Sequence, residues 1–124
     1  MGTLWKPKSF GQVIARRELT FRRGRNARRI VIAFGRPVRK PRARASEPWW
    51  TPVRIDGPAD VLATNIAGED AVQSLVLAFR FAESILVHRA RESGGRIEWL
   101  GERSKVIFGP VPHARRRASK TGRE

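Results

Sequence analysis

Residues 69–95, EDAVQSLVLAFRFAESILVHRARESGG, are the stretch that decides the fold of this chain. Apolar residues recur there every three or four positions, which is the period of an amphipathic α-helix. Glu69 and Asp70 place negative charge at the positive end of the helix dipole, and Gly94 and Gly95 end the pattern. The stretch therefore predicts one long helix that covers another element. Its expected apolar face consists of Val72, Leu75, Val76, Phe79, Ala82 and Leu86, with Ala71, Ala78 and Ile85 beside it.

Alternating segments on both sides of this helix predict the strands that it covers. Residues 12–22 alternate apolar and polar side chains, and residues 29–36 do so again, with Gly24 in the turn between them. Two such runs around a turn predict a β-hairpin. The Trp-rich residues 49–55 and residues 96–100 predict two more strands. We therefore expect an α+β fold, in which an antiparallel sheet of about four strands is covered by one helix in the order β-β-β-α-β.

Three positions refine this expectation. Pro52 lacks a backbone donor, which favours an edge strand or a bulge for residues 49–55. Arg17 interrupts the apolar side of the first strand, so we expect it near an edge, where its guanidinium can reach water. Residues 61–66 fit either a short strand or an ordered connection, and their pattern does not decide between the two.

The length of 124 residues suits a single domain. We expect it to span residues 12–109, after a loosely ordered lead-in of residues 1–11 and before a disordered basic tail of residues 110–124. Residues 36–48, RPVRKPRARASEP, contain three prolines and almost nothing apolar. They therefore predict an exposed basic loop and exclude a central strand.

The order of these elements and several short motifs resemble a known family. The hairpin is followed by a Trp-rich strand ending in IDG (55–57), a helix that opens with Asp70 and Gln73, and the strand GRIEWLGE (95–102). This combination resembles a family of small bacterial domains of unknown function, over about residues 12–109. The resemblance implies the fold and leaves the function open. The basic loop and the basic tail look like departures from the family pattern.

Composition excludes several classes of site. The chain has no cysteine, which excludes disulfides, thiolate zinc sites and a cysteine nucleophile, and which fits a reducing compartment. The N-terminus lacks the apolar core of a secretory signal, and no stretch approaches the roughly 18 apolar residues of a membrane span. We therefore expect a cytoplasmic protein with no membrane partner.

Catalytic and metal-binding residues are not indicated either. His88 and His113 are the only histidines, and neither has a second ligand at metal spacing. The acidic residues that could cluster have no base or nucleophile placed beside them by the sequence. These acidic residues are Glu69, Asp70, Glu98 and Glu102. We expect no catalytic residue, no metal and no cofactor, and hence a protein that is not an enzyme.

The net charge of +15 is concentrated in parts of the chain. Residues 1–48 hold fourteen Lys and Arg against two acidic residues, a net of +12. Residues 49–109 hold seven basic and eight acidic residues, a net of −1, and residues 110–124 add +4. A neutral body with strongly basic flanks predicts a region of positive potential.

This basic region is the candidate functional site. Arginine outnumbers lysine 21 to 5, and its planar fork binds phosphate through two hydrogen bonds and stacks on bases. Guanidiniums crowded on a hairpin tip repel one another unless an anion neutralises them. An exposed Trp50 beside them could stack on a base, although the burial tendency of tryptophan favours packing of both Trp49 and Trp50. The expected nucleic-acid-binding residues are Arg22, Arg23, Arg25, Arg28, Arg29, Arg39, Lys40, Arg42, Arg44 and Trp50.

The sequence thus leaves two functions open. The first is binding of DNA or RNA through phosphate contacts, with little sequence preference. The second is docking on an acidic protein partner, for example a toxin or a component of a defence system, through the basic hairpin or a sheet edge. Arginine abundance can also reflect a GC-rich genome, with the charges simply solvated. The oligomeric state is not indicated.

Overall fold

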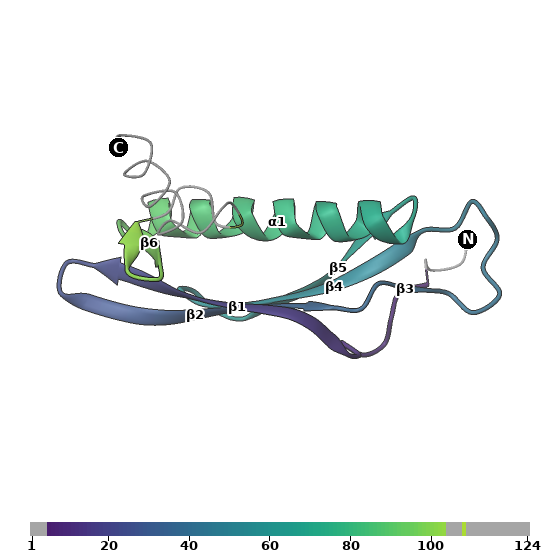
Figure 1. The fold of residues 1–124 in the computed structure, drawn as a ribbon, viewed down its shortest axis with the longest axis horizontal. Helices are drawn as coiled ribbons and strands as arrows, with labels where there is room; N and C mark the ends of the chain where they lie inside the picture. Colours follow the sequence, from purple (N-terminus) through teal and green to yellow (C-terminus); the bar gives the residue numbers. More distant parts are fainter. Residues whose placement is uncertain (1–4, 104–107, 109–124) are drawn as a thin grey trace, which may run out of the picture.

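A computed structural model describes residues 5–103 and Phe108, which form one sheet and one helix (Figure 1). The fold is α+β, as predicted, with the helix between the fifth and sixth strands. The described elements are β1 (Val13–Arg23), β2 (Asn26–Gly35), β3 (Val38–Arg39), β4 (Trp49–Asp56), β5 (Leu62–Gly68), α1 (Ala71–Glu92), β6 (Arg96–Trp99) and β7 (Glu102–Arg103).

All strand pairs in the sheet are antiparallel, and the sheet runs in the order β5-β4-β2-β1-β6-β7. The two-residue strand β3 pairs with the start of β4, on the same edge that pairs with β2 further along. The predicted loop of residues 36–48 therefore contains a short pairing, which lies beside β4 and not in the centre of the sheet. Strands β5, β3 and β7 bring the count above the four strands expected.

The hairpin of β1 and β2 forms around a two-residue turn. Arg23 pairs with Asn26, so Gly24 and Arg25 make the turn. Gly24 has φ of 59°, and no heavy atom would lie within 4 Å of a Cβ there. The glycine is therefore required by backbone conformation alone, since the first loop residue of a type II′ hairpin turn takes a positive φ.

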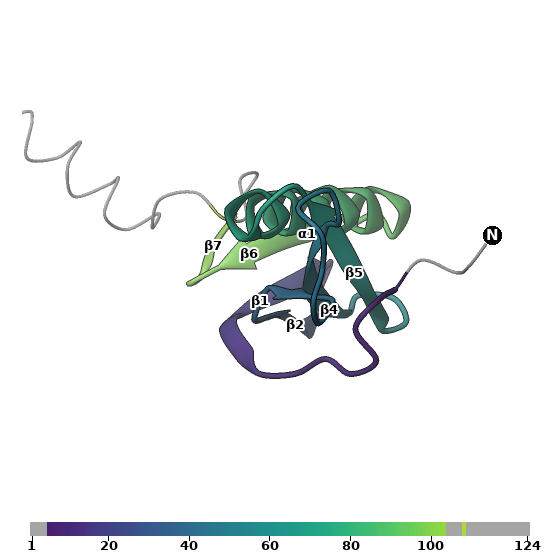
Figure 2. The ribbon, with the colours of Figure 1, turned by 90° about the vertical axis from the view of Figure 1, so that its right-hand side faces the viewer.

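Helix α1 lies lengthwise on one face of the sheet (Figures 1 and 2). Its buried residues follow one another at intervals of four and are mostly small, which allows the helix to approach the sheet closely. They are Ser74, Ala78, Ala82, Leu86 and Ala90. The predicted apolar face was wrong in part, because Val72 is 71% exposed and Val76 is 41% exposed. The larger valines lie on the outer side, and the small-residue stripe faces the strands.

The sheet supplies the large side chains of the core. Phe34, Ile30, Ile32, Ile55 and Val53 are among its largest fully buried side chains, and they alternate with outward-facing residues along β2 and β4. Thr51 and Ser74 bring a polar contact into this core, where their hydroxyl oxygens lie 2.7 Å apart. The helix and the sheet are therefore joined by apolar packing and by one buried hydrogen bond.

The helix begins with the predicted acid and glutamine. Asp70 is the N-cap, and its side chain accepts a hydrogen bond from the backbone N–H of Gln73 at 2.7 Å. The Gln73 side chain in turn accepts from the backbone N–H of Glu69 at 2.7 Å. The first bond satisfies a backbone donor that a helix leaves unpaired at its start, and the second ties the residue before the N-cap to the first turn.

By length and composition alone, α1 could also cross a membrane, contrary to the expectation that no stretch approaches a membrane span. Its mean hydropathy reaches 1.3 over an 18-residue window. A helix that packs in a protein core meets the same criteria, and the stripe of α1 from Ser74 to Ala90 is buried against the sheet.

Strand β4 lies inside the sheet, so the edge position predicted from Pro52 was wrong. Residues Trp49 and Trp50 pair with β3, and residues from Val53 onward pair with β2. Pro52 lies in the gap between these two partners, where the ladder on that edge is interrupted and a missing N–H is tolerated. On the other edge, β5 pairs with β4 from Trp49 to Ile55, which resolves residues 62–68 as a strand.

The described part of the lead-in packs against the sheet on the side opposite the helix (Figure 2). The backbone N–H of Arg36 donates to the Gln12 carbonyl at 2.8 Å, and a Cβ at Gly35 would lie 2.8 Å from the Phe10 carbonyl oxygen. The Lys6 Nζ lies 5.9 Å from the centre of the Trp50 ring. Lys6 and Phe10 of the lead-in thus lie against the sheet. The expected tail of residues 110–124 lies outside the described residues.

Candidate nucleic-acid interface

The tip of the β1–β2 hairpin brings five of the predicted arginines together. Residues 23–29 are all exposed, and Arg22 beside them is half-buried. The register pairs Arg23 with Asn26 and places Arg22 opposite Ala27. The arginines gathered here are Arg22, Arg23, Arg25, Arg28 and Arg29, and we refer to this set as the hairpin-tip cluster.

Strand alternation divides the hairpin-tip cluster between two faces. Arg28 pairs with Phe21, so both lie on the face that the helix covers, and Arg23 lies there too because it is two residues from Phe21. A hollow of about 190 Å³ on this face is lined by Phe21, Arg23, Asn26, Arg28, Pro58 and Ser93. Arg22 and Arg29 point to the opposite face, and Arg25 lies in the turn.

Two carboxylates pair with four arginines on the outer face. Glu98 on β6 is 9% exposed and accepts hydrogen bonds from Arg22 Nε and Arg96 Nε, each at 3.0 Å. Glu18 binds Arg29 and also Arg16, the latter at 3.0 Å. These hydrogen bonds, from Arg22 first for Glu98 and from Arg29 first for Glu18, lower the pKa of both carboxyls.

Arg23, Arg25 and Arg28 differ from these neighbours. Within the part of the chain that the structure describes, no carboxylate forms an ion pair with any of the three. Their side chains are exposed at the end of the molecule. They are therefore the members of the hairpin-tip cluster with charge available to an external anion.

Three arginines from late in the sequence adjoin this cluster, and sequence reasoning missed them as site residues. Arg96 on β6 pairs directly with Arg22 on β1, and Arg91 at the end of α1 lies beside it. With Arg103 on β7 they line a hollow of about 340 Å³, together with Val87, Ala90, Gly95 and Ile97. We refer to Arg91, Arg96 and Arg103 as the flanking cluster.

The lengths of the predicted helix and strands could have indicated that the flanking cluster lies beside the hairpin tip. The 22 residues of α1 span about 33 Å, and the 10 residues of β2 span about 34 Å. A helix that covers the sheet lengthwise therefore ends near one end of the hairpin. The residues that follow it are then placed beside the tip.

The basic loop of residues 36–48 does not join the hairpin-tip cluster. It lies at the opposite end of the molecule, beyond β3 in Figure 1. The single basic surface expected from the sequence is therefore two separate regions. The physical reason is that β2, which connects them, is extended along its whole length.

Two of the predicted loop residues also stabilise the loop itself. The Arg39 side chain donates to the backbone carbonyls of Arg44 and, at 3.4 Å, Glu47. Lys40 Nζ lies 3.6 Å from a carboxylate oxygen of Glu47. These contacts fold the loop back on itself. Arg42 and Arg44 remain exposed there.

Trp50 is not placed as the sequence suggested for a base-stacking residue. It is 6% exposed, on the outer face of β4 beneath the lead-in. Trp49 is half-buried, and the guanidinium carbon of Arg39 lies 5.8 Å from the centre of its ring. Trp50 is thus packed, as the burial tendency of tryptophan favoured, and it cannot stack on an extruded base without a rearrangement.

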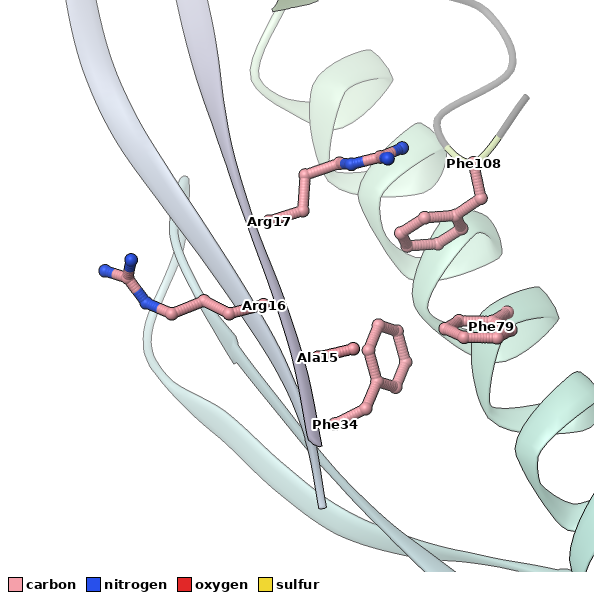
Figure 3. A pocket seen from close by; sticks show the side chains of 6 residues that line it. All are labelled: Ala15, Arg16, Arg17, Phe34, Phe79 and Phe108. Atoms are coloured by element: carbon pink, nitrogen blue, oxygen red, sulfur yellow. The ribbon is translucent and has the colours of Figure 1, made fainter. Parts of the chain in front are cut away.

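An aromatic hollow of about 260 Å³ lies between the sheet and the helix near β1 (Figure 3). It is lined by Ala15, Arg16, Arg17, Phe34, Phe79 and Phe108. Arg17 lies on the part of β1 that β6 does not reach, as its predicted edge position requires. Its guanidinium carbon is 3.7 Å from the centre of the Trp99 ring, a cation–π contact, and burial lowers its pKa.

The acidic residues and the histidine that lie within the described residues do not form a common site. Glu69 and Asp70 lie at the start of α1, whereas Glu98 lies near its end. His88 Nε2 lies 3.8 Å from Glu92 one helical turn away, and both side chains are 70% exposed. Residues 5–103 and Phe108 contain no group of three possible metal ligands.

Comparison with known proteins identifies the family. A family model described as "Domain of unknown function (DUF6968)" matches residues 15–110. No curated protein and no solved structure matches this chain. The matched range includes both the hairpin-tip cluster and the flanking cluster, and it agrees with the resemblance found in the sequence over residues 12–109. The chain belongs to the DUF6968 family of domains of unknown function.

Proposed function

We propose that this chain is a non-enzymatic cytoplasmic protein that binds nucleic acid through phosphate contacts, with little sequence preference. The observation that carries the proposal is the group Arg23, Arg25 and Arg28. These three guanidiniums are exposed together at a hairpin tip and have no carboxylate partner among the described residues. Concentrated charge of this kind favours a polyanion, because each neutralised phosphate releases a counterion.

The flanking cluster supports the same proposal. Arg91 and Arg103 are exposed and extend the positive surface from the hairpin tip across β6 and β7. Arginine contacts to phosphate position a nucleic acid without reading its sequence. Non-specific affinities of this type fall at about 1–100 µM near physiological salt, and we expect the chain to bind in that range.

The test compares two variants of equal net charge. Arg23→Gln, Arg25→Gln and Arg28→Gln together remove three charges at the hairpin tip. Arg36→Gln, Arg42→Gln and Arg44→Gln remove three exposed charges at the opposite end. Binding of a labelled duplex is measured by fluorescence anisotropy between about 50 and 200 mM salt, the range over which phosphate contacts weaken steeply.

We expect the hairpin-tip variant to lose most of the affinity and the opposite-end variant to keep it. The slope of log K against log salt should decrease in magnitude by about 2 to 3 in the hairpin-tip variant, since each phosphate contact contributes roughly 0.9. Equal losses in both variants would mean that net charge alone governs binding. Salt-independent binding, or no binding of DNA or RNA at low salt, would contradict the proposal.

Docking on an acidic protein is the second candidate, and one observation favours it. Strand β6 pairs with β1 only from Thr20 to Arg22, so within the described residues the edge from Val13 to Glu18 has no strand partner. Val13 and Ile14 on this edge are 48% and 45% exposed. An open edge of this kind can accept a strand from another chain. A stoichiometric protein that co-purifies with the chain after nuclease treatment would favour this candidate over nucleic acid.

A further inference from the structure

We infer that the nucleic acid is duplex DNA and that the tip of the β1–β2 hairpin enters its major groove. This inference rests on the proposed function and names the substrate class for the same surface. It follows from the shape of the hairpin end, from the distribution of its charges and from the location of the aromatic rings.

The last residue pair of the hairpin and its turn, Arg23–Asn26, form a two-stranded end without neighbouring strands. Strand β6 pairs with β1 as far as Arg22, and β4 pairs with β2 only from Val31 onward. Opposite Ala27–Arg29, β6 still flanks β1, so only Arg23–Asn26 lack a neighbouring strand on both edges, and the tip extends past the end of α1 in Figure 1. The tip is free to enter a space that the rest of the sheet cannot.

The dimensions of a ribbon fit one groove and not the other. Paired strands lie about 4.8 Å apart. The major groove of B-form DNA is about 12 Å wide and admits a two-stranded ribbon, whereas the minor groove is about 6 Å wide. The Arg23–Asn26 pair and the turn extend about 7 Å beyond the Arg22–Ala27 pair at about 3.4 Å per residue, which is close to the major-groove depth of about 8.5 Å.

The positions of the charges suit a groove that is lined by phosphates on both sides. Arg23 and Arg28 lie on the helix-covered face of the ribbon and Arg25 is at the turn, all without a carboxylate partner among the described residues. On the outer face, Arg22 and Arg29 share Glu98 and Glu18 with two further arginines, which leaves an excess of positive charge there. A protein that lies flat on a polyanion needs charge on one face only. A ribbon with guanidiniums on both faces and at its end is matched by a groove lined on each side by phosphates.

Single-stranded nucleic acid is a poorer match, because its binding without sequence preference uses aromatic platforms. Every aromatic side chain among the described residues is buried or half-buried. At the hairpin end, Phe21 is 5% exposed, and the Trp99 ring is covered by the guanidinium of Arg17. Bases that leave the stack would therefore find no fully exposed ring among the described residues.

Duplex RNA is a poorer match for a different reason. The major groove of A-form RNA is deep and narrow, so protein elements do not enter it. A ribbon with its charge at the tip would contact only the outer phosphates of such a helix. The flanking cluster, which lies beside the ribbon through the pairing of Arg96 with Arg22, is then placed to contact phosphates at the rim of the DNA groove.

The experiment measures binding of the full chain to three ligands of one sequence: duplex DNA, the corresponding single-stranded DNA and duplex RNA. Fluorescence anisotropy at fixed low salt should give a dissociation constant for duplex DNA at least about tenfold lower than for the other two. The hairpin-tip variant (R23Q/R25Q/R28Q) should lose this preference. The opposite-end variant (R36Q/R42Q/R44Q) should keep it.

The groove itself is tested with modified duplexes. Bulky sugar groups on the 5-position of cytosine fill the major groove and should weaken binding about tenfold or more, since that position projects into this groove. A minor-groove-binding polyamide added in excess should leave binding unchanged.

The possible outcomes distinguish insertion in the major groove from phosphate binding in general. Equal affinity for duplex DNA, duplex RNA and single strands would overturn the groove inference and leave phosphate binding intact. Insensitivity to the bulky cytosine groups, or competition by the polyamide, would overturn insertion in the major groove. Absence of binding to all three ligands would overturn both.

Discussion

Glu98 is buried between two arginines, and its ionised form stabilises the fold. Its folded pKa is lowered by hydrogen bonds from Arg22 first and Arg96 second. Its stabilising contribution is therefore complete above the unfolded pKa of about 4.3 and is lost as the pH falls through the lower folded pKa. We expect Glu98→Gln to lower the Tm at pH 7, because two guanidiniums lose their charged partner.

The difference in Tm between the native chain and Glu98→Gln should shrink below about pH 4, where the carboxylate is protonated in both states. Thermal unfolding monitored by circular dichroism at several pH values measures this. Glu92→Gln is the control, since Glu92 is 70% exposed and should change the Tm little. A difference that stays constant with pH would show that shape, and not charge, explains the effect.

The buried hydrogen bond between Thr51 and Ser74 gives a second prediction at the residue scale. Both residues are 0% exposed. Ser74→Ala leaves the Thr51 hydroxyl without its partner and should lower the free energy of unfolding by about 1–3 kcal/mol. The double variant Thr51→Val/Ser74→Ala should recover part of this loss, because no polar group is then left unsatisfied. Urea denaturation of the single and double variants provides the cycle.

At the residue scale, the sequence predicted which residues form the helix cap better than it predicted which side chains are exposed. Asp70 and Gln73 were identified from their spacing and form the helix start as expected. Trp50 was considered as an exposed stacking residue beside the interpretation that it packs, and the structure shows it packed. Strand alternation alone cannot show that another segment covers the outer face. The segment that covers this face is the lead-in, and its sequence has no periodic pattern from which the contact could be predicted.

At the scale of elements, the start of α1 can be tested directly. Asp70→Ala removes the acceptor for the Gln73 backbone N–H and should lower the free energy of unfolding by about 1 kcal/mol. Asp70→Asn keeps an acceptor at the same position and should have a much smaller effect. Chemical denaturation of the two variants checks the prediction, and equal losses would show that the charge matters more than the cap.

The hairpin, the helix and the last main strand were predictable because each has a strong period or a clear turn. The face that α1 buries was less predictable. Val72 and Val76 are more apolar than Ser74, yet Ser74 is buried, since a small side chain allows close approach and finds a hydroxyl partner in Thr51. The strand β5 was left open because the short run 61–66 has a weak alternation and gains its structure from β4.

At the scale of the whole molecule, the lead-in acts as a cover for the outer face. A variant that begins at Gln12 lacks the residues that lie over Trp50 and Gly35. We expect its free energy of unfolding to fall by about 1–3 kcal/mol, in line with partial exposure of a large aromatic side chain. Its tryptophan emission should move to longer wavelength, and an unchanged spectrum and stability would contradict a packed lead-in.

The location of the two basic regions also belongs to this scale. Charge counted along the sequence placed the hairpin tip and the loop of residues 36–48 in one region. A strand of about 34 Å separates them in space. The sequence predicted this strand, and the length of the strand implies the separation. A count of charges along the sequence does not take that length into account.

The length of the projecting end of the β1–β2 hairpin does not affect the stability of the rest of the fold. Two extra residues in each strand near the turn would lengthen the ribbon by about 7 Å and preserve the side on which every arginine lies. No buried contact of the sheet or of α1 would change. The length of this ribbon can therefore change while the core stays the same.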